Sequence, residues 1–352
     1  MATESGYMRD GRQSTSRGVR ALALAGAICA LGTFPQAAAA HGPLAPIASS
    51  YLARVTGTPA GLNVKAVDGD QRMWLDAAQV ERVVVFDYRG APYLLFSRAG
   101  VAVNHNSAMY YLNQNPAQRP PPGLSPGVPP SWHQVTTARE YSWHDGRLHA
   151  LATVALAPGA SFVGNWRIPL SVDGRRTAIS GSLSHADDPS LVWFWPIVVL
   201  LACAVAAGRI GRRWLDNVIA EALALLALAG TATLAAGNEL YGRPHVVTGQ
   251  LVVLALVLAF VAYGLVRVLL RRAGGFHLFL ISFVALWAGG ASLQVLLNGY
   301  VLMAVPSFVA RTAVVLSLGC GGGLFLALLA RMDRSDEASA PAPDGVTQAA
   351  VR

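Results

Sequence analysis

A series of apolar segments in the C-terminal half of the chain constrains its fold more than any other feature. Five segments are long enough to cross a bilayer whose hydrocarbon core is about 30 Å thick. They cover residues 191–207, 215–236, 246–270, 276–297 and 308–330. Of the whole chain, 53% is hydrophobic and only 13% is charged, which is too apolar for an ordinary soluble protein. We therefore expect an α-helical membrane domain of five spans over residues 191–332.

Arginines lie at alternate ends of these segments. The three clusters are Arg209, Arg212 and Arg213 after the first segment, Arg267, Arg271 and Arg272 at the end of the third, and Arg331 and Arg334 after the fifth. Cytoplasmic ends of spans carry an excess of basic residues. The pattern predicts a multi-pass cell-membrane protein with residues 41–190 outside and the C-terminus inside. The net charge of +8 is then explained by membrane topology, and no nucleic-acid partner is expected.

The N-terminal 40 residues have the pattern of a secretory signal peptide. Several arginines precede an apolar stretch over residues 21–33, and a run of alanines fills residues 37–40. Cleavage after Ala40 would leave His41 at the mature N-terminus, whereas cleavage one residue earlier would not, and both sites are open. A terminal histidine binds Cu(II) through its amine and its ring nitrogen. At the other end, residues 333–352 are rich in Ala, Pro and Asp and are expected to be disordered.

Residues 41–190 have the pattern of an all-β domain. Short alternating segments are divided by turn residues, which favours an antiparallel sandwich of the immunoglobulin or cupredoxin type. The expected strands are 62–67, 72–75, 82–88, 93–97, 101–104, 140–144, 147–154, 161–169 and 177–183. The phase of these strands places Trp74, Phe86, Trp143 and Trp166 in the core. The proline-rich residues 115–130 are expected to form a surface loop.

Asp145-Gly146 lies between two alternating segments and predicts a two-residue β-hairpin. In that register Trp143 and Leu148 face the core, while His144 and His149 form a diagonal pair on the opposite face. Two imidazoles at this separation can bind one transition-metal ion. The alternative is that both histidines are simply solvated on an exposed hairpin.

Few other residues offer metal ligands. His105 or Met109 could complete a copper site, because imidazole and thioether both suit copper; alternatively Met109 packs in the domain and the neighbouring polar residues hold the loop. The cysteines, Cys29, Cys203 and Cys320, all lie in apolar runs, so free buried thiols are expected and no disulfide.

Several segments of the chain carry a resemblance to a known family. They are His41-Gly42, Val67-Asp68-Gly69-Asp70, residues 87–93, residues 106–113, Trp132 and residues 143–149. Together these segments, over about residues 41–185, resemble an uncharacterised family of secreted, membrane-tethered actinobacterial proteins. That family's motif is approximately Trp-His-Asp-His-Arg-x-His-Trp-Met. His144, Asp145, Arg147 and His149 match it, whereas Gly146, Ala150 and Leu151 depart, which removes one histidine.

A second similarity concerns the site alone. Periplasmic copper-resistance C proteins and the soluble subunit of particulate methane monooxygenase bind copper with a terminal histidine, the latter beside a histidine pair. His41 with His144 and His149 is similar in kind. Asp145 either orients His144 through a hydrogen bond or, as a hairpin-tip residue, bonds the backbone of its own turn, and the second role is favoured. A likeness of site does not transfer an activity.

The polar residues of the apolar segments have simple interpretations. Glu221 lies near the cytoplasmic arginines and Asp216, where an interfacial ion pair is favoured over a proton relay. A second group lies near the outer face and forms either a vestibule or polar helix caps: Asn238, Glu239, His245, Gln294, Asn298 and Arg311.

Three function classes follow. No nucleophile with a base, phosphate-binding loop or paired carboxylates stands out, so an enzyme is the weaker class. The leading hypothesis is an extracytoplasmic copper-binding protein that handles or delivers copper, with the bilayer and a copper-receiving or other membrane protein as partners. The second is a metal-free structural protein whose β domain docks a partner, and the third is a copper-dependent oxidase.

Overall fold

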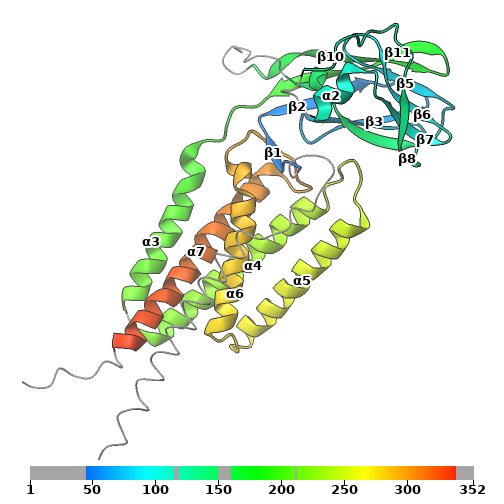
Figure 1. Cartoon of the computed structure of the whole chain (residues 1–352). Coiled ribbons are helices and arrows are strands. Elements are labelled where there is room, and N and C mark those ends of the chain that lie inside the picture. Colours follow the sequence, from blue (N-terminus) through cyan, green and yellow to red (C-terminus); the bar gives the residue numbers. More distant parts are fainter. Residues whose placement is uncertain (1–44, 115–118, 150–159, 211, 338–352) are drawn as a thin grey trace, which may run out of the picture. The chain divides into compact units, whose positions relative to one another are not determined.

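The computed structural model describes residues 45–114, 119–149, 160–210 and 212–337. In these residues an antiparallel β region comes first and a helical part follows (Figure 1). The predicted signal peptide, His41 and residues 338–352 lie outside the described residues, as does most of the predicted strand 147–154. Residues 333–337, which were expected to belong to a disordered tail, instead continue the last helix, so that part of the prediction was wrong.

Seven strands form the larger sheet, and all neighbouring strands in it are antiparallel. In spatial order they are β2 (Tyr51–Gly57), β11 (Arg175–His185), β10 (Phe162–Val172), β5 (Val83–Phe86), β6 (Pro92–Ser97), β7 (Gly100–Asn104) and β8 (Trp132–Thr136). The longest pair, β10 and β11, is joined through Asp173 and Gly174, which have φ angles of 47° and 84°. Positive φ at both central residues is what a tight hairpin of this twist requires.

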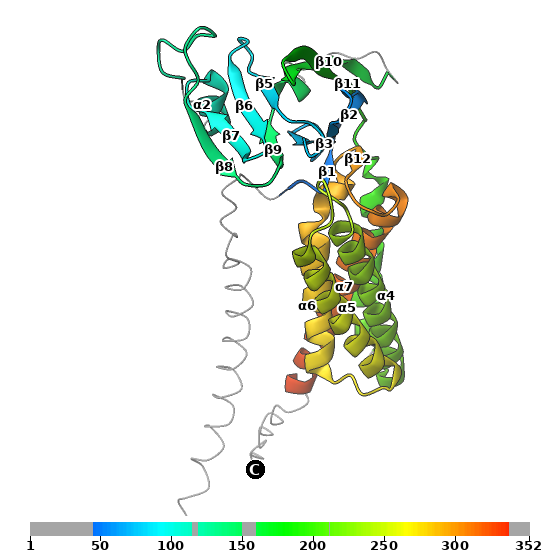
Figure 2. The same cartoon turned by 90° about the vertical axis from the view of Figure 1, so that its right-hand side faces the viewer.

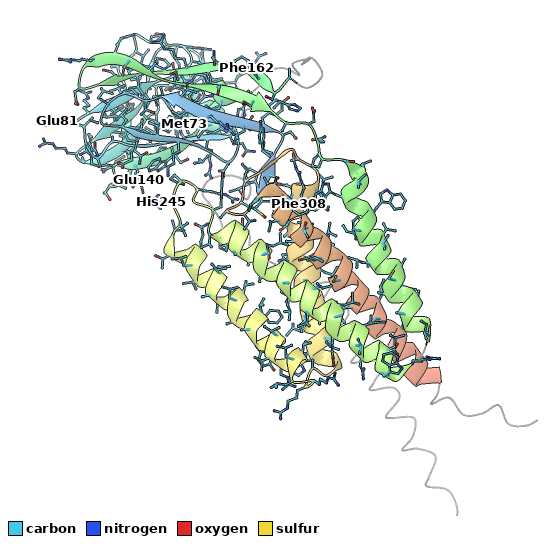
Figure 3. The ribbon with its side chains drawn as sticks, turned by 180° about the vertical axis from the view of Figure 1, so that it is seen from behind. Met73, Glu81, Glu140, Phe162, His245 and Phe308 are labelled. Carbon is cyan, nitrogen blue, oxygen red and sulfur yellow. The ribbon has the colours of Figure 1, made fainter. Side chains whose placement is uncertain are left out.

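Three strands form a smaller antiparallel sheet, in the order β3 (Asn63–Val67), β4 (Arg72–Asp76) and β9 (Glu140–His144). Both sheets contribute to one hydrophobic core. Met73, Leu75 and Trp143 enter it from the smaller sheet and residues such as Phe96 and Leu170 from the larger one. Figure 3 shows Met73 inside the β region.

Eight of the nine predicted strands are confirmed, and the predicted turns at residues 68–70, 89–90 and 173–174 lie between them. The ninth is wrong at its start, where a 3-10 helix, η1 (Gly146–Leu148), replaces it. β2, β8 and a short helix, α2 (Ala108–Gln114), were not predicted from the sequence. Both missed strands lie at the edges of the larger sheet, and of their residues only Ala53 is fully buried, so they lack a clear apolar alternation.

Two of the four predicted core aromatics are confirmed, because Trp143 and Trp166 belong to the core cluster. Phe86 is only partly buried, since Val85 points inward and the register of β5 shifts between Val85 and Phe86. The Arg176 guanidinium lies 5.0 Å from the Phe86 ring centroid and covers it. The prediction for Phe86 was therefore wrong.

Trp74 is buried, but on the opposite face of β4 from Met73 and Leu75. Its ring is covered by Lys65 Nζ, 5.7 Å from the ring centroid, and by His245, whose ring centroid is 6.4 Å away. Since Trp74 contacts groups outside the main core, its burial was predicted correctly and its face was not.

The helical part contains α3 (Trp195–Ile210), α4 (Arg213–Glu239), α5 (Thr248–Leu269), α6 (Gly275–Ala291) and α7 (Ser307–Glu337), with 3-10 turns η2 (Leu191–Phe194) and η3 (Leu293–Leu296). Four helical segments are long and apolar enough to cross a membrane, and α6 is a shorter apolar helix. Helix α7 packs against α3, α4 and α6, while α5 packs on α4 (Figure 1, Figure 2).

Small residues let these helices approach closely, as the glycines of residues 289–290 and 319–323 predict. A Cβ added to Gly289 would lie 2.8 Å from Leu318 Cγ, and one added to Gly321 would lie 3.0 Å from Ala285 Cβ. Gly290, in contrast, has nothing within 4 Å. Close packing is therefore confirmed at Gly289 and Gly321 but not at Gly290.

A short strand pair links the start of the described chain to its end. β1 (Ala48–Ser49) pairs with β12 (Tyr300–Val301), which directly precedes α7, and Ala48 is buried among helix residues. Arg311 of α7 donates hydrogen bonds to the carbonyls of Val295, Asn298 and Gly299. It thereby acts as a polar cap of this turn region.

Replacing Gly181 with alanine should destabilise the β region, because the new Cβ would lie 2.0 Å from the Trp166 ring and 2.2 Å from the Arg54 carbonyl oxygen. Overpacking of this kind costs about 2 kcal/mol or more. Gly164→Ala is the matched control, since nothing lies within 4 Å of its Cβ position. Denaturant unfolding followed by tryptophan fluorescence measures both, and equal stabilities of the two variants would contradict this packing.

Candidate functional site

The structure brings His144 and His149 together, although not through the predicted hairpin. Strand β9 ends at His144 and pairs with β4, and η1 then turns the chain so that His149 follows it. The two ring centroids are 4.8 Å apart, with the ring planes at 33°. The predicted proximity of the histidines is thus found, while the predicted pairing of residues 140–144 with 147–154 is wrong.

Asp145 organises this turn. Its side chain is fully buried and accepts hydrogen bonds from Trp143 Nε1 at 2.9 Å and from Arg147 Nε at 2.8 Å and Nη2 at 2.6 Å. It also accepts from the Arg147 backbone N–H at 3.1 Å, which caps η1. Asp145 therefore positions both histidines through the backbone on either side of it, and it is not an exposed hairpin tip.

Two residues from other segments hold the turn in place. The Tyr88 hydroxyl accepts from the Gly146 N–H at 2.8 Å, and burial, followed by the charge of Asp145, raises the pKa of Tyr88. Asn113, at the end of α2, donates to the His144 carbonyl at 2.9 Å and to the Tyr93 hydroxyl at 2.8 Å. Residues 87–93 and 106–113, two of the segments that carry the family resemblance, thus contact this turn.

Asp70 is the site residue that the sequence analysis missed. One of its carboxylate oxygens lies 3.0 Å from His149 Nδ1. A proton on Nδ1 donated to this carboxylate leaves the ring's lone pair on Nε2. Nε2 of His149 is excluded from solvent and has no hydrogen-bond partner among the described residues. A buried nitrogen lone pair of this kind is suited to bind a metal ion.

The environment of His144 favours its neutral form. Burial lowers the pKa of His144, and the neighbouring His149 lowers it further. The carboxylates of Asp145 and Asp70 and a backbone hydrogen bond with Gln71 act in the opposite direction. A neutral imidazole keeps a lone pair, so His144 is prepared for a ligand role at neutral pH.

His105 and Met109 have other partners. The His105 ring stacks on His133 at 3.7 Å with 12° between the planes, and on Tyr110 at 4.1 Å. Lone pairs in two parallel stacked rings point along separate planes and do not converge on one ion. Met109 is fully buried in the core of the β region. Its packing matches the alternative interpretation, in which Met109 is not a ligand.

Over residues 45–337, apart from the undescribed gaps, no group of three or more His, Cys, Asp or Glu side chains has the arrangement of a metal site. His144 and His149 are the two imidazoles that the described residues bring together at this turn. Of the cysteines in this part, Cys320 is a buried free thiol as predicted, whereas Cys203 is exposed.

The predicted ion pair of Glu221 with one of the clustered arginines is found: its partner is Arg271, with 3.9 Å between the nitrogen and oxygen atoms. Comparison of the chain with protein-family models, curated proteins and solved structures found no match.

Replacing Asp145 with asparagine should destabilise the β region by about 3 kcal/mol, because it leaves the Arg147 guanidinium, whose side chain is only 15% exposed, without its carboxylate. Glu81→Gln is the matched control, since Glu81 and its partner Arg98 are 73% and 78% exposed. That variant should lose at most about 0.5 kcal/mol. Denaturant unfolding distinguishes the two, and similar small losses would show that the buried pair does not organise the turn.

Proposed function

We propose that residues 41–190 form an extracytoplasmic copper-binding module fixed to a membrane domain, and that the protein handles or delivers copper. One observation carries the proposal. His149 Nε2 is buried and without a hydrogen-bond partner in the described chain, beside the His144 ring, while Asp70 bonds the other nitrogen of His149. A carboxylate behind a histidine is the usual support of a metal-bound imidazole.

The choice of copper rests on the type of ligand. Sites built from imidazole nitrogens bind copper more tightly than other divalent first-row metals. The described part of the chain offers no thiolate near these histidines, because Cys203 and Cys320 lie in α3 and α7. We propose His41 as the third ligand residue, using its free amine and its ring nitrogen after cleavage behind Ala40.

Chain length supports this role for His41. Gly69 directly precedes Asp70, and a Cβ added to Gly69 would lie 2.9 Å from Ser49 Cβ. The start of the described chain therefore passes beside the turn that holds Asp70. The eight residues from His41 to Ser49 span up to roughly 27 Å when extended. The connection is long enough for a terminal histidine to reach the pair.

We further propose that the β region is a sandwich of the immunoglobulin or cupredoxin type and that all five apolar helices cross the membrane. Two sheets around one core support the sandwich. The fifth span is supported by length: the rise per residue of each helix type gives α6 and η3 together about 30 Å, the thickness of the hydrocarbon core. The alternating arginines support an outer β region and a cytoplasmic C-terminus.

Copper titration of the mature full-length protein in detergent tests the ligands. We expect one Cu(II) per chain, with the affinity at least tenfold lower for Asp70→Asn and lower still for His144→Gln or His149→Gln. His133→Gln is the matched control, because His133 is exposed and stacks on His105. If His144→Gln and His149→Gln both bind copper with wild-type affinity, the proposed site is wrong.

A variant with one extra alanine before His41 tests whether the terminal histidine contributes to binding in addition to His144 and His149. If His41 binds, this extension weakens binding and changes the Cu(II) spin-resonance spectrum, because the amine and the ring no longer belong to the same residue. If the extension is harmless while His149→Gln is not, the pair binds copper without the terminus. If no form binds copper, the metal-free docking function is favoured.

Reporter fusions test the topology. A reporter in the exposed loop at Gly127 should be active outside the cell, and one after Glu337 should be active inside. Five spans place these two points on opposite sides of the membrane, whereas four spans, without α6, place them on the same side. Two reporters active on one side would therefore exclude the five-span arrangement.

A further inference from the structure

A cavity of about 620 Å³ lies at the end of the helical part where α4 and α6 begin and α5 ends. Its lining includes Trp214 and Asn217 of α4, Arg271 of the loop after α5, and Arg331 near the end of α7. None of these residues takes part in the proposed copper site, so this cavity needs a separate explanation.

The cavity is lined by an arginine with one guanidinium nitrogen that lacks an acceptor among the described residues. Arg331 Nη2 is excluded from solvent and has no hydrogen-bond partner among the described residues. Arg271 also lines the cavity; its side chain is 80% exposed and lies 3.9 Å from the Glu221 carboxylate. A buried cationic donor without an acceptor is costly. An anion in the cavity would give Arg331 an acceptor. Glu221 also lines the cavity, but the two arginines outnumber this one carboxylate.

Two helix N-termini add to this positive potential. Helix α4 starts after Arg212 and α6 starts after Gly274, and neither has a side-chain cap for its first backbone N–H groups. Asp216, in the first turn of α4, offsets part of the positive charge at that N-terminus, whereas α6 has no acidic residue in its first turn. Uncapped N-termini carry partial positive charge and bind phosphate oxygens. Trp214, Gly274 and Gly275, from the first residues of these helices, all line the cavity. Arginine side chains and backbone donors are therefore available at one place.

The surroundings of the cavity are apolar and exposed. Trp214 is 64% exposed, Val218 is 48% exposed, and Phe276, next to Gly275, is 74% exposed. Exposed tryptophan beside apolar side chains is typical of the level where lipid headgroups meet hydrocarbon. A ligand with a phosphate and an acyl chain would match both the charge and the apolar rim, whereas a soluble phosphate would leave the rim uncovered.

We propose that this cavity binds the phosphate group of an anionic membrane phospholipid, with Arg271 and Arg331 as its ligands and the acyl chains lying beside Val218 and Phe276. Basic pockets between spans are known to hold such headgroups. In the topology proposed above, the lipid belongs to the cytoplasmic leaflet. The inference does not depend on copper binding.

Native mass spectrometry of the full-length protein, exchanged into mixed detergent micelles with phosphatidylglycerol and phosphatidylcholine, tests the proposal. The wild type should retain phosphatidylglycerol selectively. Arg331→Gln and Arg271→Gln should each weaken retention about fivefold, as expected for one basic residue at a lipid phosphate. Arg271 is exposed, so its replacement reports on binding even if Arg331→Gln lowers stability.

Arg272→Gln is the matched control, because Arg272 is the exposed neighbour of Arg271 but does not line the cavity. It should retain phosphatidylglycerol like the wild type. An equal loss of phosphatidylglycerol retention in all three variants would indicate nonspecific electrostatic attraction and overturn the proposed site. Unchanged retention in both Arg331→Gln and Arg271→Gln would also overturn it. Displacement of the lipid by millimolar inorganic phosphate would show that a soluble phosphate is the ligand, and would also overturn the proposal.

Discussion

The arrangement of the candidate site depends on one buried carboxylate. Asp145 accepts from the Trp143 indole and from the Arg147 guanidinium, and this pair of contacts fixes the turn between His144 and His149. Arg147 in turn donates to the Phe86 carbonyl and lies 5.2 Å from the centre of the Tyr88 ring. The hydrophobic core, the 3-10 turn and the histidine pair therefore share one network, and a buried charge of this kind persists only because every partner is in place.

This network also explains which parts of the fold were predictable. Alternating segments and glycine turns predicted most strands, since these signals are local. The hairpin predicted at Asp145-Gly146 was wrong because the Asp145 side chain bonds Trp143 and Arg147 and caps η1. A hairpin on the surface would not provide these buried partners. The face of Trp74 was predicted wrongly for a different reason: its ring is covered by Lys65 and His245, which lie outside the core cluster.

The candidate site was predictable only in part, for the same reason. His144 and His149 are neighbours in sequence, so any tight turn brings them close. Asp70 is 79 residues from His149, and Asn113 is 31 residues from His144, and no local pattern indicates such contacts. The motif segments pointed to these residues without assigning them a role, and only the folded arrangement shows that they support the histidines.

The pairing of β1 with β12 has a consequence for the order in which the molecule can be completed. Ser50 bonds to Asn298, 248 residues later in the chain, and the adjacent strands pair Ser49 with Tyr300 and Ala48 with Val301, at similar separations. At ordinary rates of synthesis, a delay of roughly 10 to 50 s separates the emergence of these two segments. During that time the N-terminal strand has no partner, although the sheets between can already form. β1, near the start of the described chain, is thus among the last strands to reach its final place.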